Sequence, residues 1–79
     1  MIKKLGKYII SDPRVCGGKL TFIGTRILVK GVLESLEDGL SFDEIINEWH
    51  QKVNKEAILE AIHLANKVFS KYQKDLVTK

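Results

Sequence analysis

Few residues in this 79-residue chain are of types that do chemistry, and their spacing argues against catalysis. Cys16 is the single cysteine, and as a nucleophile it would need His50 or His63 as its base. Nothing in the spacing of the three residues supports such a pair, and they also lack the paired spacing of metal ligands. We therefore expect no enzyme activity, no cofactor and no metal site.

Two other segments could bind an anion. Gly17-Gly18-Lys19 is not a phosphate loop, because the upstream glycine is missing and Leu20 replaces Ser or Thr. Arg26 is a better candidate, since its planar guanidinium suits bidentate pairing with a carboxylate or a phosphate. The alternative is that the segment around Arg26 is a structural β-arm that covers a helical core.

Residues 10–29 hold the only proline, the only cysteine and three of the six glycines, which indicates turns and strands. Residues 8–10 and 20–23 are rich in aromatic and β-branched side chains and predict two short strands. These strands could pair within one subunit or across a dimer. Gly24 indicates a bulge or tight turn that re-aims Thr25 and Arg26.

Two helices are predicted next. Residues 29–38 place apolar side chains at helical spacing, and Gly39 follows as a left-handed C-cap. Ser41 and Glu44 form the capping box of a second helix, which runs to about Trp49. We expect Trp49 to continue the apolar face of that helix into the core.

A third helix is predicted from the N-cap Asn54 to about Ser70. The fold class is therefore mainly α: a single domain with a β-arm (1–28), a three-helix helix-turn-helix core (29–70) and a polar C-terminal extension (71–79). The extension either continues the helix or frays.

A chain this short buries a thin core, and one cysteine allows no disulfide framework. We therefore predict a homodimer that forms through the arm. The predicted interface contains Tyr8, Ile10, Phe22, Ile23, Gly24, Thr25, Arg26 and Ile27.

In a helix-turn-helix domain the third helix reads the major groove of DNA. The predicted contacts are Lys52, Asn54, Lys55 and Leu59 on bases, with Lys30 and Lys67 on phosphates. Glu56 and Glu60 would repel phosphate, and the third helix carries no arginine, the side chain that most often reads guanine. The helix could instead serve dimerisation or a protein partner.

The net charge of +3 and the pI of about 9.1 permit a nucleic-acid or acidic protein partner without requiring one. No apolar run approaches the ~18 residues of a membrane span. The basic N-terminus is not followed by the apolar run of a signal peptide. We expect a cytoplasmic protein with no membrane contact.

Three motifs carry a family resemblance: Asp-Pro-x-x-x-Gly-Gly-Lys at 12–19, Gly-Thr-Arg-Ile at 24–27 and Gly-x-Ser-x-x-Glu-Ile at 39–45. Over about residues 8–69 the chain resembles the domain of unknown function 433 family. The resemblance implies a homeodomain-like helix-turn-helix fold and a VapB-type antitoxin, encoded beside a PIN-like nuclease toxin. Such an antitoxin would silence the nuclease and, as a dimer, repress its own operon by binding operator DNA. Silencing would be steric, or it would insert a charged side chain into the nuclease's acidic, metal-binding site, for which Arg26, Lys74 and Lys79 are the candidates.

Two other functions stay open. The chain could be a stand-alone helix-turn-helix regulator without a toxin partner, or a protein-interaction dimer module that does not bind DNA. A neighbouring nuclease gene would separate the antitoxin from both, and salt-sensitive, sequence-selective DNA binding would separate the last two.

Overall fold

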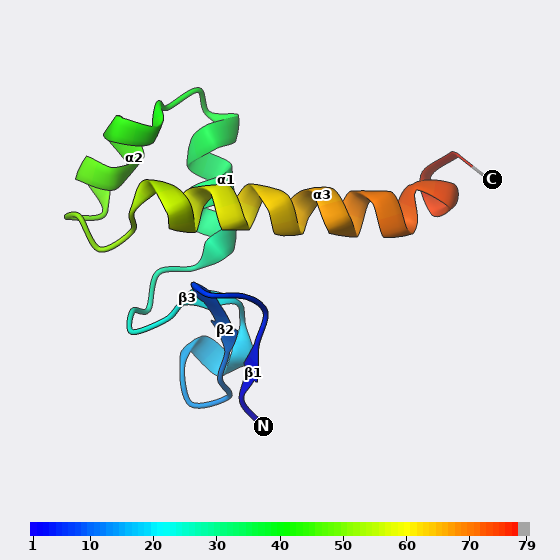
Figure 1. Cartoon of the computed structure of the whole chain (residues 1–79), viewed down its shortest axis with the longest axis horizontal. Helices are drawn as coiled ribbons and strands as arrows, with labels where there is room; N and C mark the ends of the chain where they lie inside the picture. The colour runs from blue at the N-terminus through cyan, green and yellow to red at the C-terminus, as the bar shows by residue number, and fades with distance from the viewer. Residues whose placement is uncertain (78–79) are drawn as a thin grey trace.

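A computed structural model describes residues 1–77 and shows a small antiparallel sheet followed by three helices (Figure 1). The strands are β1 (Lys3–Lys4), β2 (Ile9–Ser11) and β3 (Thr21–Phe22), and a 3-10 turn, η1, spans Cys16–Gly18. The helices are α1 (Val29–Glu37), α2 (Phe42–Glu48) and α3 (Lys55–Val77). The prediction of an N-terminal β-arm followed by three helices is confirmed.

The sheet has the order β1-β2-β3 and closes within one chain. Ile9 lies opposite Phe22, and Ile10 lies between Thr21 on one side and Lys4 on the other. The two predicted strands therefore pair in the same subunit. The third strand, β1, was not predicted, because Lys3 and Lys4 have the composition of a solvated terminus.

The helix ends follow local signals in the sequence. Gly39 adopts φ +92° after α1, as expected of a left-handed C-cap. Ser41 Oγ accepts the Glu44 N–H at 3.1 Å and Glu44 Oε1 accepts the Ser41 N–H at 2.7 Å, which confirms the capping box. The Ser41 backbone N–H, and then the Ser41 hydroxyl, hold the pKa of the Glu44 carboxyl below its ordinary value. Asn54 Oδ1 accepts the Ala57 N–H at 2.8 Å and so caps α3.

The link between α2 and α3 turns through two consecutive left-handed residues. His50 and Gln51 have φ of +56° and +66°, which is uncommon for residues other than glycine. The Gln51 N–H is hydrogen-bonded to the carbonyl of Ile46, so the end of α2 is closed by backbone bonds. The link is therefore ordered although it is longer than a tight helix-turn-helix turn.

The core lies where the three helices meet the sheet. Its fully or nearly buried apolar side chains come from β2, β3, all three helices and the loop before α3: Ile9, Phe22, Val29, Val32, Ile45, Val53, Ala57, Ile58 and Ala61. Trp49 packs against this cluster and is partly buried, as predicted. Because β2 and β3 each supply a core side chain, the arm is part of the hydrophobic core of the domain.

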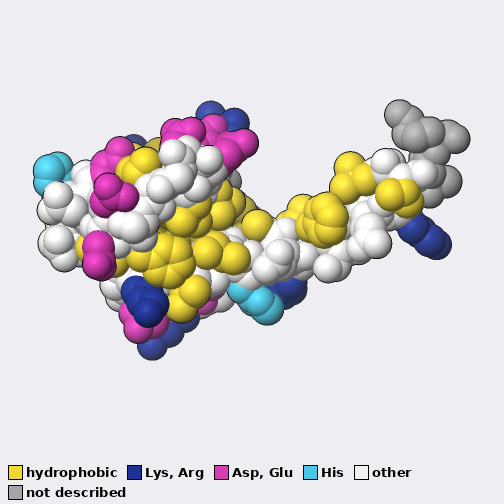
Figure 2. Space-filling view, turned by 90° about the horizontal axis from the view of Figure 1, so that it is seen from above, with side chains coloured by type: hydrophobic (Ala, Val, Ile, Leu, Met, Phe, Trp, Pro, Cys, Tyr) yellow, Lys and Arg dark blue, Asp and Glu magenta, His cyan; other side chains and the backbone are white. Residues whose placement is uncertain are grey.

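One helix leaves the body of the domain. α3 continues to Val77, well past the expected end near residue 70, and its C-terminal part projects beyond the other elements (Figure 1). All side chains of residues 65–77, which we call the distal half of α3, are exposed. Apolar side chains continue from the body along this projection (Figure 2).

Candidate functional site

The arm (residues 1–28) is braced by a carboxylate near the end of β2. Asp12 is 8% exposed and accepts three hydrogen bonds from Arg14: from the backbone N–H at 2.9 Å, from Nε at 3.0 Å and from the terminal guanidinium nitrogen at 2.9 Å. The Arg14 side chain, and then its backbone N–H, hold the pKa of Asp12 below the ordinary 3.8. Asp12 and Arg14 therefore neutralise each other, and Asp12 fixes the turn that follows β2.

This pairing makes part of the stability depend on pH. Because the pKa of Asp12 is lowered by folding, its contribution is complete above the unfolded value of 3.8 and is lost as the pH falls through the folded value. We expect Asp12→Asn to lower the urea midpoint at pH 7, and its difference from the wild type to shrink at about pH 3. A difference that is the same at both pH values would contradict this account. Glu44 is present in both proteins, so its contribution to the pH dependence of the urea midpoint cancels in the difference.

A hydrogen-bonded turn after β3 presents Arg26. The Thr25 hydroxyl donates to the carbonyl of Phe22 at 2.8 Å and accepts the Ile27 N–H at 3.0 Å. Gly24 adopts φ +80°, a conformation that other residues rarely take. The turn was predicted, and its effect is to hold Arg26 exposed at the surface of the arm.

Arg26 shares a surface hollow with a lysine from a distant part of the chain. The arm hollow is lined by the ends of β2 and β3, the turn after β3 and the loop before α3, namely by Ile10, Asp12, Val15, Thr21, Gly24, Thr25, Arg26 and Lys52. Within residues 1–77, neither Arg26 nor Lys52 forms an ion pair. Two uncompensated cations therefore line this hollow, which suits a carboxylate or phosphate group.

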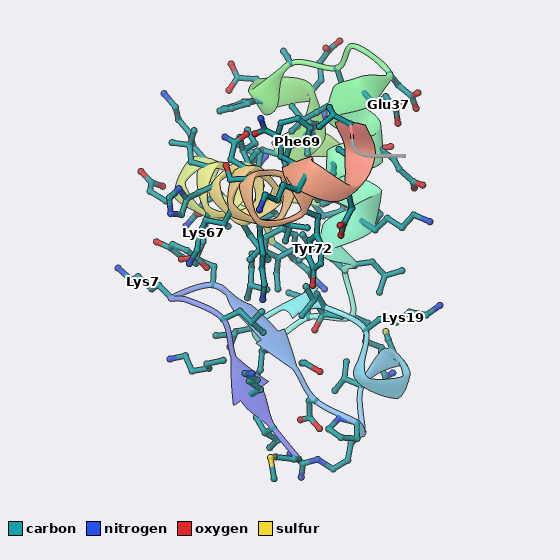
Figure 3. All side chains as sticks on the ribbon, turned by 90° about the vertical axis from the view of Figure 1, so that its right-hand side faces the viewer. Lys7, Lys19, Glu37, Lys67, Phe69 and Tyr72 are labelled. Atoms are coloured by element: carbon teal, nitrogen blue, oxygen red, sulfur yellow. The ribbon has the colours of Figure 1, made fainter. Side chains whose placement is uncertain are left out.

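The charges of the chain are strongly segregated. The arm carries six basic side chains and one acidic one, which are Lys3, Lys4, Lys7, Arg14, Lys19 and Arg26 against Asp12. Residues 29–49, which contain α1 and α2, carry one basic and six acidic ones, which are Lys30 against Glu34, Glu37, Asp38, Asp43, Glu44 and Glu48. Figure 3 shows Lys7 and Lys19 on the arm and Glu37 on the helical body. A cationic arm therefore adjoins an anionic pair of helices.

The predicted DNA contacts fall into separate places. Lys52, Lys55 and Leu59 are exposed at or before the start of α3, whereas Asn54 uses its side-chain oxygen as the helix cap. Lys30 lies 3.8 Å from Glu34 on α1. Lys67 lies on the distal half of α3, about 18 Å along the helix axis from Lys55. The structure thus brings together only the contacts around the start of α3.

The predicted interface residues are also divided. Phe22 is 2% exposed in the core of its own subunit, and Tyr8 packs partly buried against that core. The exposed members gather in the turn after β3: Ile23, Gly24 and Arg26, with Thr25 and Ile27 partly exposed. Ile10 is partly buried in β2 and lines the arm hollow.

Cys16 is a free thiol whose Sγ lies 3.7 Å from the carbonyl of Arg26. In the part of the chain that the structure describes, no group of three or more His, Cys, Asp and Glu side chains is placed to hold a metal ion. Of the candidates for insertion, Arg26 lies at the arm hollow, Lys74 lies on the distal half of α3, and Lys79 is outside the described residues.

One contact that joins the arm to α3 could not be predicted from the sequence. The Glu60 carboxylate accepts the backbone N–H of Lys7 at 2.9 Å and of Tyr8 at 2.7 Å. The neighbouring Gly6 has φ +153°, and a Cβ there would lie 2.7 Å from the carboxylate. Glu60, for which the sequence predicts only repulsion of phosphate, therefore holds the arm against α3.

Comparison with known proteins gives one match. The family described as "Protein of unknown function (DUF433)" matches residues 9–65, well over half of the chain. No curated protein and no solved structure shows a significant match. Among residues 1–77, no helix has the length and apolar character needed to cross a membrane.

Proposed function

We propose that this chain, which belongs to the DUF433 family, is the antitoxin of a toxin–antitoxin pair and binds a PIN-like nuclease through its arm. The observation that carries the proposal is the cationic arm hollow, where Arg26 and Lys52 stand without ion-pair partners among residues 1–77. Acidic active sites that bind metal ions present several carboxylates close together. An exposed arginine beside a lysine complements such a site in charge and in hydrogen-bonding geometry.

Arg26 is the better placed of the two described candidates for insertion. The turn after β3 is fixed by both hydrogen bonds of Thr25, so the base of the Arg26 side chain is held in place. A preorganised contact loses less conformational entropy on binding. Lys74, by contrast, is a flexible side chain on a helix that projects from the body.

The test is the affinity for the PIN-like nuclease encoded by the neighbouring gene, measured by calorimetry. We expect Arg26→Ala to raise the dissociation constant at least about tenfold, as removal of a central interface arginine often does. The matched variant Lys74→Ala also removes one exposed cation, and we expect it to change the constant by less than about threefold. Equal effects would overturn the role of Arg26, and failure of the wild type to bind would overturn the proposal.

Operator binding is the second candidate function, and the same cationic arm favours it. The arm carries six basic side chains and one acidic one, and this excess of positive charge suits binding to a phosphate backbone. The helix-turn-helix pair of α2 and α3 is less suitable for binding DNA. The first helix of such a pair crosses the DNA backbone, and here that helix, α2, carries Asp43, Glu44 and Glu48. Fluorescence anisotropy with upstream and scrambled duplexes at two salt concentrations tests this candidate. Selective binding that survives the higher salt and weakens in Lys55→Ala supports it, whereas equal binding to both duplexes opposes it.

A further inference from the structure

The arm hollow has the size of a small-molecule site. Its volume is about 590 Å³, which lies within the range of ligand pockets in proteins. Ile10 from β2 and Val15 from the loop after β2 give it an apolar lining, and Arg26 and Lys52 add two cations. A ligand that matches this lining has an organic part and carries negative charge.

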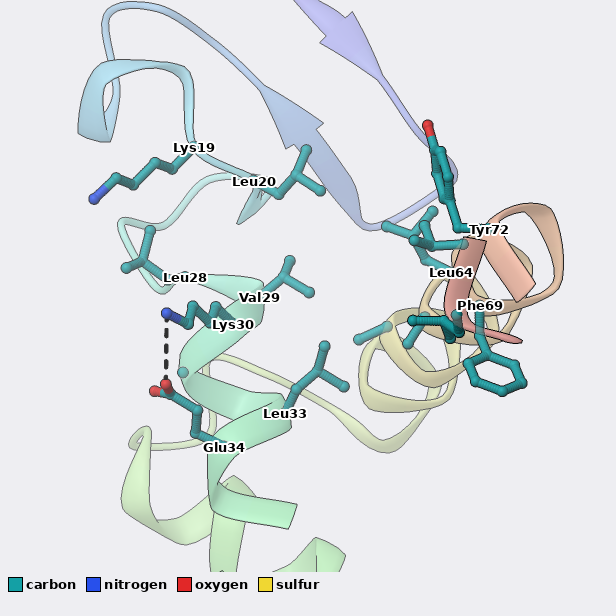
Figure 4. A pocket seen from close by; sticks show the side chains of 15 residues that line it. Lys19, Leu20, Leu28, Val29, Lys30, Leu33, Glu34, Leu64, Phe69 and Tyr72 are labelled. Atoms are coloured by element: carbon teal, nitrogen blue, oxygen red, sulfur yellow. Dashed lines mark ion pairs between the residues drawn. The ribbon is translucent and has the colours of Figure 1, made fainter. Parts of the chain in front are cut away.

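The larger groove between α1 and α3 offers no comparable charge (Figure 4). Its walls are apolar side chains such as Leu33 and Leu64, and Lys30 at its rim lies 3.8 Å from Glu34. Lys19 also lines this groove, but its side chain points away from α3. The arm hollow is therefore the better anion site of the two.

The charged groups without partners in the arm hollow are all hydrogen-bond donors. Arg26 and Lys52 carry only N–H donors and form no ion pair within residues 1–77. The Asp12 carboxylate also lines the hollow, but it accepts three hydrogen bonds from Arg14, and its side chain is only 12% exposed. The unpaired groups therefore require a ligand whose polar atoms are acceptors.

A buried hydroxyl in the same lining supports this chemistry. Thr21 is 1% exposed, and its hydroxyl has no hydrogen-bond partner among residues 1–77. Leaving a buried hydroxyl unpaired is unfavourable, and a bound acceptor would remove that penalty. Rotation about the Cα–Cβ bond can turn this hydroxyl toward the hollow that Thr21 lines. The hydroxyl of Thr25, by contrast, already donates to the carbonyl of Phe22 and accepts the Ile27 N–H.

We propose that the arm hollow binds a phosphate monoester with a small organic group. A monoester carries close to two negative charges at neutral pH, so it balances Arg26 and Lys52 together. Its three terminal oxygens can accept hydrogen bonds from the guanidinium, the ammonium and the hydroxyl of Thr21. A carboxylate or a phosphodiester carries a single charge and would leave one cation unbalanced. The organic group would lie against Ile10 and Val15.

The first test is an NMR titration of the isotope-labelled chain with phenyl phosphate at constant ionic strength. We expect the backbone amide signals of residues 21–27 to shift, with a dissociation constant of about 1 mM or below. Phenyl sulfate has a similar shape and one charge less, and benzoate is a carboxylate. We expect both to bind at least about fivefold more weakly. Equal binding of the three probes, or no shift at about 20 mM phenyl phosphate, would overturn the proposal.

Substitutions in the hollow locate the phosphate group. We expect Arg26→Ala to raise the dissociation constant at least about tenfold and Lys52→Ala about threefold. Lys55→Ala is the matched control, because it removes an exposed lysine that does not line the hollow, and we expect no change. The site would be wrong if Arg26→Ala bound phenyl phosphate as tightly as Lys55→Ala does.

Thr21→Val separates a ligand contact from a structural role. The substitution keeps the shape of the side chain and removes a hydroxyl that has no partner in the described chain. We expect phenyl phosphate to bind about threefold more weakly, while the urea midpoint stays the same or rises. Wild-type affinity in this variant would overturn the part that Thr21 has in the site.

The monoester could belong to a small metabolite or to the end of a nucleic-acid chain. Ribose 5-phosphate represents the first source, and a trinucleotide with a 5′-phosphate represents the second. Binding of the trinucleotide at least about tenfold tighter than the sugar phosphate assigns the site to a nucleic-acid end, and equal binding assigns it to a small ester. A trinucleotide with a 5′-hydroxyl that binds as tightly as the phosphorylated one would overturn the selectivity for a monoester.

A bound ester would also compete with the nuclease, and this consequence rests on the proposed function. Phenyl phosphate at about ten times its dissociation constant should weaken nuclease binding about tenfold, and phenyl sulfate at the same concentration only about threefold. Unchanged nuclease affinity would overturn the competition. The titrations use the chain alone, so failure of the nuclease to bind would overturn only the proposed function, and failure of phenyl phosphate to bind would overturn only this inference.

Discussion

Replacing Ile58 with Ala is expected to lower the free energy of unfolding by about 3 to 4 kcal/mol. Ile58 is 0% exposed in the first turns of α3, the helix that contacts α1, α2 and β2. Truncation removes buried methyl groups and leaves a cavity that the surrounding elements cannot close. A chain of this length has a total stability of roughly 4 to 12 kcal/mol, so the variant would be close to unfolding.

Urea unfolding followed by circular dichroism measures this loss. Leu59→Ala is the matched control, because Leu59 is the next residue in α3 and is 46% exposed. We expect that control to cost less than about 1 kcal/mol. If both variants lost the same stability, the position of Ile58 at the centre of the core would be wrong.

Glu60→Ala is expected to release the arm from α3 and to cost about 2 kcal/mol. Its carboxylate accepts the backbone N–H groups of Lys7 and Tyr8, and hydrogen bonds to a charged acceptor are stronger than those to a neutral one. The substitution leaves both N–H groups without this partner. We therefore expect faster hydrogen exchange at these two amides, together with the loss of stability.

Three further variants make this test specific. Glu56→Ala removes an exposed carboxylate one turn earlier in α3 and should leave the exchange of both amides unchanged. Glu60→Gln keeps one acceptor oxygen and should give an intermediate effect. Gly6→Ala should resemble Glu60→Ala, because its Cβ would displace the carboxylate and its φ is unfavourable. Unchanged protection of Lys7 and Tyr8 in Glu60→Ala would contradict the proposed fastening.

The helices could be predicted because their signals are local. Ser41 with Glu44, Gly39 after α1 and Asn54 before α3 each act within a few residues of the boundary that they set. The turn that presents Arg26 was predictable for the same reason, since Gly24 lies beside it. The C-terminal end of α3 could not be predicted in this way, because no glycine or proline in that part of the sequence marks a helix end.

The rest of the site depends on contacts between distant residues. Glu60 meets Lys7 and Tyr8 across 53 and 52 positions of sequence, and Lys52 joins Arg26 only after the chain has folded. Strand β1 is held by pairing with β2 rather than by its own composition. The segregation of charge was visible in the sequence as a block of six acidic residues and one lysine over residues 29–49, but the net charge of +3 conceals it.

The most direct test of the proposed function is RNA cleavage by the nuclease of the neighbouring gene, titrated with this protein. We predict that cleavage falls to background near one chain per nuclease active site, and that Arg26→Ala shifts the titration to higher concentrations. Undiminished cleavage in the presence of a large excess of the folded wild-type protein would contradict the antitoxin function.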